Sequence, residues 1–140
     1  SSWKGPHEMP RHLRMLRGTH PERILTPVVL KQALPVVRWQ MGVEQPEDMA
    51  LFNTLITVHP VDQLKAQIDA CITWNGPASP VKDLVHIHGD LDRLMPIGPI
   101  HDAHCIRGGS HFMVYNKAKE VSDEVSRALA GMPTLDASTT

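Results

Sequence analysis

Aromatic side chains are scarce in this 140-residue chain, which has three Trp, two Phe and one Tyr. A core built from it must therefore rely on aliphatic side chains, and the chain is long enough to bury such a core. An excess of charge is absent as well, because 14 Lys and Arg oppose 15 Asp and Glu, with the two signs interspersed. This balance provides no electrostatic footprint for nucleic acid or for an anionic membrane, so we expect neither as a partner.

Long apolar runs and a cysteine framework are also missing. Pro27, Pro35 and several charged residues interrupt the most apolar stretch, so we expect no segment that spans a bilayer. Cys71 and Cys105 stand in unlike contexts, which predicts buried free thiols in a reducing compartment, the cytoplasm. The chain opens on Ser1 without an initiator methionine or a signal sequence, which predicts a piece of a longer or processed protein.

The first half of the chain, from residue 6 to about 78, has the pattern of helices separated by short breaks. Thr26-Pro27 predicts the start of one helix, and Gly42 its end. That helix is apolar nearly all round, which indicates burial or an apolar groove. Pro46 and Pro60 open two further helices, each with an apolar stripe on one face.

The second half changes period. Residues 83–89 and 103–106 are short, apolar and followed by glycine, which predicts two strands. Asn116 is expected to cap a final helix whose inward face includes Val125 and Leu129. Strand, loop, strand and helix without a hairpin turn predict a parallel α/β sheet. Because two strands do not form a stable sheet alone, we expect further strands from sequence before Ser1.

A candidate acid follows the first predicted strand in the segment Gly89-x-x-Asp92. An acid just beyond the carboxyl end of a parallel strand lies where α/β enzymes place their chemistry. Asp90 competes with Asp92 for this role. A solvated turn with two acids is the structural alternative.

A candidate base follows the second predicted strand in Gly108-Gly109-Ser110-His111-Phe112. Glycines allow a sharp turn that directs the next histidine back across the strand ends, where its Nε2 can act as general base and acid. Taken alone, His111 is more typical of a histidine on a surface loop. Together with Asp92, in the order acid then histidine, it matches the last two members of a Ser, Asp, His triad.

A zinc site is the alternative use of the same region. His86-Ile87-His88-Gly89-Asp90 resembles the His-x-His-x-Asp-His motif of metallo-β-lactamase-like hydrolases, with Leu91 in place of the last histidine. His86 and His88 would share one face of a strand. Because no further ligand cluster is evident, we expect two buried structural histidines and no bound metal.

On the residues from Leu84 to Leu129, and above all on Asp92-x-x-x-Pro96 and Gly108-Gly109-x-His111, the chain resembles the C-terminal half of an α/β-hydrolase. The resemblance implies an α/β fold of parallel strands with flanking helices plus a helical cap. Residues 1–140 would be a partial hydrolase domain, in which residues 6–59 form the cap or lid and residues 60–132 the last strands and helices of the core.

The resemblance also implies a function. Asp92 and His111 would be the triad acid and base of an esterase-like or lipase-like enzyme that needs no cofactor. Its substrate would be a small molecule with an apolar acyl or alkyl group. No Gly-x-Ser-x-Gly elbow occurs in the chain, so the nucleophile and the oxyanion strands should come from a missing N-terminal half, and residues 1–140 alone should be inactive. A non-catalytic binding module of the same fold, or less favourably a zinc hydrolase using His86, His88 and Asp90, remains as the alternative.

Overall fold

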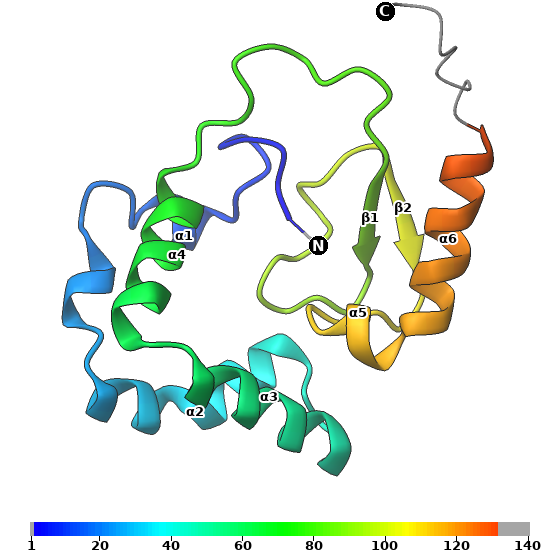
Figure 1. The fold of residues 1–140 in the computed structure, drawn as a ribbon. Coiled ribbons are helices and arrows are strands. Elements are labelled where there is room, and N and C mark those ends of the chain that lie inside the picture. Colours follow the sequence, from blue (N-terminus) through cyan, green and yellow to red (C-terminus); the bar gives the residue numbers. More distant parts are fainter. Residues whose placement is uncertain (1, 132–140) are drawn as a thin grey trace, which may run out of the picture.

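We describe the protein from a computed structural model, in which residues 2–131 are described. The chain combines helices with one small parallel sheet and is therefore broadly α/β. Figure 1 shows α1 to α4 gathered on one side and the two strands, with α5 and α6, on the other. The elements in chain order are α1 (Arg11–Arg14), the 3-10 helix η1 (Pro21–Ile24), α2 (Pro27–Met41), α3 (Pro46–Val58), α4 (Val61–Thr73), β1 (His86–Gly89), β2 (Ala103–Ile106), α5 (Met113–Asn116) and α6 (Ala118–Gly131).

The ends of α2 lie where the sequence predicts them. The Thr26 hydroxyl accepts a hydrogen bond from the backbone N–H of Val29, which satisfies one of the free donors of the first turn. Gly42 takes a left-handed conformation (φ 72°) and ends the helix. A Cβ on Gly42 would lie 2.2 Å from Cβ of Ser110, so this glycine also lets the helix end approach the turn that carries His111.

Of the two possibilities for the apolar helix α2, burial or an apolar groove, burial is wrong, because no residue of α2 is buried. Only one row of its side chains packs inward, against a core of Val43, Phe52 and Phe112. The opposite face is open, and Val28 and Trp39 are 64% and 59% exposed. Partly buried side chains from α2 and α3 complete this core; they are Leu34, Val37, Met41, Met49, Leu55 and Ile56.

The sheet consists of two parallel strands, as the sequence predicts. His86 pairs with Ala103 and Gly89 pairs with Ile106. β1 is shorter than the predicted strand over 83–89, and it is preceded by a loop that runs from α4 (Figure 1). The end of β1 lies close to the turn after β2: a Cβ on Gly89 would lie 2.2 Å from the carbonyl oxygen of Gly109.

The final helix differs from its prediction. Asn116 is the last residue of α5 rather than the cap of α6, and its side-chain amide donates to the carboxylate of Asp48. Val125 and Leu129 are exposed, whereas Glu124 is the buried residue of α6. A two-stranded sheet is too narrow to cover a long helix face, so the apolar positions beyond β2 stay in solvent.

The N-terminal segment is anchored by Glu8, which is 1% exposed. Its carboxylate accepts hydrogen bonds from the backbone N–H of Lys4 (2.7 Å) and of His101 (3.4 Å). Burial would raise the pKa of Glu8, but these hydrogen bonds and the ammonium of Lys4, 3.2 Å away, outweigh it and lower the pKa. Glu8 thereby ties the start of the chain to the loop before β2.

Cys71 and Cys105 are free, as predicted, but both are exposed rather than buried. The burial prediction fails because the helix and strand that carry them each have one uncovered side. Within residues 2–131, none of the helices has the length and apolar character needed to cross a bilayer.

Candidate catalytic pair

Asp92 and His111 lie side by side at the carboxyl end of the parallel strands. Nδ1 of His111 is 2.8 Å from Oδ2 of Asp92, within hydrogen-bond distance. A carboxylate accepts, so Nδ1 is the donor in this contact, and in the neutral imidazole Nε2 then has a free lone pair. The structure therefore brings together the two residues that the sequence pairs, although their catalytic role stays a prediction.

The carboxylate of Asp92 is held from more than one side. Its side chain is fully buried, and Oδ1 accepts a hydrogen bond of 2.7 Å from the backbone N–H of Met95. The backbone N–H of Asp92 itself reaches the carbonyl oxygen of Gly89 at 3.4 Å. The turn after β1 thus fixes the carboxylate in one orientation, as a group that orients an imidazole requires.

His111 is positioned by the residue that follows it. The Phe112 side chain enters the core and meets the ring of Phe52 edge to face at 6.2 Å. The backbone N–H of Phe112 donates to the carbonyl oxygen of Met41 at the end of α2. His111 itself stays partly open, with 17% of its side chain exposed, so its ring has one buried partner and access to solvent.

Asp90, the competing acid, has a different partner. Its Oδ1 accepts a hydrogen bond of 2.7 Å from the backbone N–H of Gly108, and its own N–H reaches the carbonyl oxygen of Ile106. Asp90 therefore fastens the turn after β1 to the turn after β2. Of the two acids, Asp92 is the one that contacts His111.

His86 and His88 are buried on one face of β1, with ring centroids 5.5 Å apart. Burial lowers the pKa of each imidazole, and in His86 the neighbouring His88 lowers it further. Nε2 of His88 donates to the carbonyl oxygen of Met95 at 2.7 Å. His86, His88 and Asp90 do not form a metal-ligand cluster in the described part of the chain.

A polar cavity of about 380 Å³ lies next to residues that flank the pair in the chain, although neither Asp92 nor His111 lines it. It is lined by neighbours of the pair, Leu91, Arg93 and Ser110, together with charged and amide side chains of the helical half. The Arg93 guanidinium donates to the Trp39 carbonyl oxygen and to Oε1 of Glu44, both at 2.9 Å, and lies 5.1 Å from the centre of the Trp39 ring. Arg93 thus links the turn after β1 to the end of α2.

Sequence reasoning missed this arginine. Arg93 follows Asp92 directly, but its partners are 49 and 54 residues away, so no local pattern signals the contact. Ser110 was also not singled out, and its hydroxyl accepts a hydrogen bond from the backbone N–H of Phe112. This hydrogen bond stabilises the turn that carries His111.

The arrangement supplies an oriented imidazole base, but the sequence has no nucleophile motif that this base could activate. An imidazole held by a buried carboxylate accepts and returns a proton, but hydrolysis through a triad also needs a nucleophile and oxyanion donors.

No family model, curated protein or solved structure matches this chain.

Proposed function

We propose that residues 1–140 form the acid and histidine part of an α/β-hydrolase whose complete form cleaves an ester or related acyl bond. The observation that carries this proposal is the 2.8 Å contact between His111 and the buried carboxylate of Asp92 at the ends of two parallel strands. The parallel pairing and the order acid then histidine also agree with this architecture.

In the proposed reaction, Nε2 of His111 takes the proton of a nucleophile hydroxyl as its oxygen attacks the ester carbonyl. His111 then gives that proton to the leaving alkoxide, and water repeats both steps to release the acid. Asp92 remains ionised throughout and stabilises the imidazolium. The nucleophile and the oxyanion donors come from outside residues 1–140 in this proposal.

The substrate proposed is a small ester with an apolar acyl or alkyl group. The support is the open apolar face of α2, where Val28, Val36 and Trp39 are each more than half exposed. The polar cavity is lined by charged and amide groups, which would suit the polar end of such a substrate.

Steady-state hydrolysis of p-nitrophenyl butyrate tests the proposal. The polypeptide that contains residues 1–140 together with the upstream segment of its gene should turn the ester over, and His111→Ala should lower kcat by roughly three orders of magnitude. His12→Ala, at an exposed histidine of α1, is the matched control and should keep full activity. Residues 1–140 alone should not exceed the rate of free imidazole.

Two results would contradict the proposal. Saturable turnover by residues 1–140 that His111→Ala abolishes would reveal a nucleophile inside the chain. An inactive complete polypeptide would favour the alternative function, a binding module that uses the polar cavity and in which Asp92 and His111 only stabilise the fold.

A further inference from the structure

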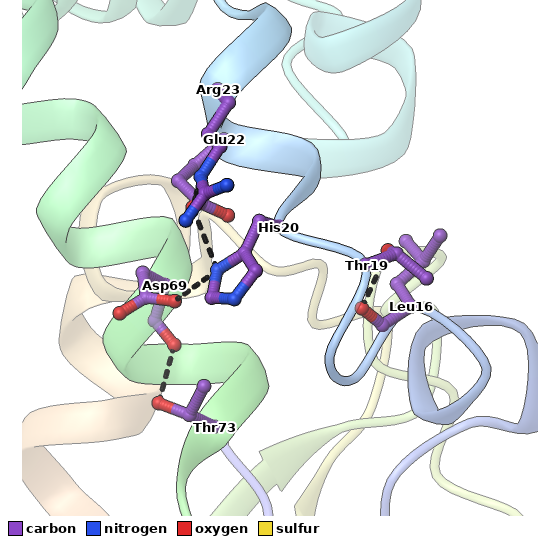
Figure 2. A network of polar contacts seen from close by, with 7 residues as sticks. All are labelled: Leu16, Thr19, His20, Glu22, Arg23, Asp69 and Thr73. Atoms are coloured by element: carbon purple, nitrogen blue, oxygen red, sulfur yellow. Dashed lines mark hydrogen bonds and ion pairs between the residues drawn. The ribbon is translucent and has the colours of Figure 1, made fainter.

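Three side chains of the kinds that bind transition metals meet far from the catalytic pair, where η1 packs against α4. Nδ1 of His20 is 3.2 Å from Oε1 of Glu22 and 4.0 Å from Oδ1 of Asp69, and the three ligand atoms all lie within 4.8 Å of one another. Figure 2 shows both carboxylates facing the same ring nitrogen of His20. Within residues 2–131, this is the one group of three such ligands.

The spacing of these atoms fits a metal ion. A tetrahedral Zn²⁺ with bonds of about 2.0–2.1 Å places its ligand atoms about 3.3 Å apart. The distance from His20 to Glu22 already has this value, and the distance to Asp69 exceeds it by less than 1 Å. Because His20 and Asp69 are both 45% exposed in their side chains, small rotations close the remaining gap.

A second observation points to a missing partner at the same place. Oε2 of Glu22 is buried and has no hydrogen-bond partner among the residues that the structure describes. The Glu22 side chain as a whole is only 12% exposed. An unsatisfied buried carboxylate oxygen destabilises the fold, so such groups usually have a partner, an ion included. A cation held by Glu22 would supply it.

The neighbouring cation does not fill this role. Nε of Arg23 is 4.0 Å from Oε1 of Glu22, the oxygen that already faces His20, and the Arg23 side chain is 74% exposed. It is free to turn toward solvent when a metal binds. The proton that Nδ1 of His20 now shares with Glu22 would be displaced by the metal, because a metal-bound imidazole nitrogen must be unprotonated.

We propose that His20, Glu22 and Asp69 bind one Zn²⁺ ion, with water completing its coordination. The imidazole nitrogen favours zinc over Mg²⁺ or Ca²⁺, which prefer oxygen ligands alone. Two ligands come from the segment that begins η1 and the third from the middle of α4, so the ion ties the N-terminal segment to that helix. The site is structural and independent of Asp92 and His111.

The test is a zinc titration of the full chain, freed of metal with a chelator and followed by competition with a chromogenic zinc indicator. The background is Cys71→Ser with Cys105→Ser, because exposed thiols bind zinc adventitiously. One equivalent should bind, and both His20→Asn and Asp69→Asn should weaken its affinity at least tenfold. Asn suits the left-handed backbone of His20 (φ 52°), so the variant should keep its fold.

Matched controls and a second readout separate the site from surface binding. His12→Asn and Asp62→Asn, which alter an exposed histidine and an exposed acid outside the cluster, should leave the affinity unchanged. Zinc should raise Tm in the background protein and not in His20→Asn. Equal zinc affinity in cluster and control variants would mean adventitious binding only and would overturn the proposal, as would an absence of stoichiometric binding. If His20→Asn does not fold, Glu22→Gln provides the same comparison.

Discussion

Asp92 is the residue on which the candidate site depends, because its carboxylate serves both a backbone amide and an imidazole. Asp92→Ala would leave two partly buried donors, the backbone N–H of Met95 and Nδ1–H of His111, without this acceptor. We expect the free energy of unfolding to fall by about 3 kcal/mol, since buried groups that lose a charged partner are costly. Urea unfolding monitored by circular dichroism measures this.

Asp123→Ala is the control for that substitution. Asp123 pairs with Lys119 on the open surface of α6, with both side chains more than half exposed. Removal of such a pair should change the free energy of unfolding by less than about 1 kcal/mol. Equal losses in the two variants would mean that the Asp92 contacts contribute no more than a surface ion pair.

At Gly89 the prediction rests on the lack of room for a side chain rather than on charge. A Cβ at this position would lie 2.2 Å from the carbonyl oxygen of Gly109, and the obstacle is backbone that cannot rotate away. Gly89→Ala should therefore lower the free energy of unfolding by about 3 kcal/mol and separate the two turns. Gly98→Ala, where a Cβ meets no atom within 4 Å, should stay within about 0.5 kcal/mol of the parent. Thermal melts of the two variants make the comparison; equal Tm values would contradict it.

At the scale of elements, β1 carries two buried imidazoles that make the fold sensitive to pH. Burial lowers the pKa of His86 and of His88 below the unfolded value of about 6.5. The unfolded chain therefore binds more protons than the folded one. The stability that depends on keeping these two histidines neutral is fully present well above pH 6.5 and is lost as the pH falls through and below that value. Between pH 7.5 and 5.5 the protonation of each histidine in the unfolded chain should lower the free energy of unfolding by roughly 1 kcal/mol at most.

Urea unfolding at these two pH values measures the effect. His86→Phe should reduce the pH dependence, because phenylalanine has no group that titrates. The substitution also removes no hydrogen bond, since neither ring nitrogen of His86 has a hydrogen-bond partner among residues 2–131. His12→Ala should leave the pH dependence unchanged. The pKa of Glu8 is lowered, so protonation of Glu8 reduces the free energy of unfolding only below about pH 4.5, outside this window. An unfolding free energy that does not vary between pH 5.5 and 7.5 would contradict the prediction.

The elements also show what a sequence can predict. The start of α2 at Thr26-Pro27, its end at Gly42 and the two strands before glycine turns all rest on local chemistry, and they were predicted. The pairing of Asp92 with His111 was predicted from chain order and two glycine turns. These features depend on residues that are close in sequence or on a known strand direction.

Contacts between distant segments were not predictable in this way. Arg93 with Glu44 and His20 with Asp69 join positions that no spacing rule connects. The exposure of Val125 and Leu129 was missed for a related reason, because it depends on how wide the sheet is rather than on the helix itself. Helix periodicity identifies an apolar face, but only the neighbours decide whether that face is covered.

At the scale of the whole molecule, much apolar surface remains open. Leu84 and Val81 before β1, Val28 and Trp39 on α2, and Leu129 on α6 are each more than half exposed. Apolar surface of this extent and the open edges of a two-stranded sheet favour association. We expect residues 1–140 alone to form oligomers through this open apolar surface, as light scattering after gel filtration would show. A monodisperse monomer with a sharp thermal transition would instead favour a self-sufficient domain and the binding-module function.

The parallel pairing of the strands has a consequence for how the chain folds. Each residue of β1 pairs with the residue seventeen positions further on, as His86 does with Ala103. Most contacts that hold Asp92 and His111 together also lie between residues 86 and 113. Loop-closure entropy is small over such a short span, so this segment can find its geometry early and by itself. We expect the contact of Phe112 with Met41 to join this segment to the helices later and more slowly.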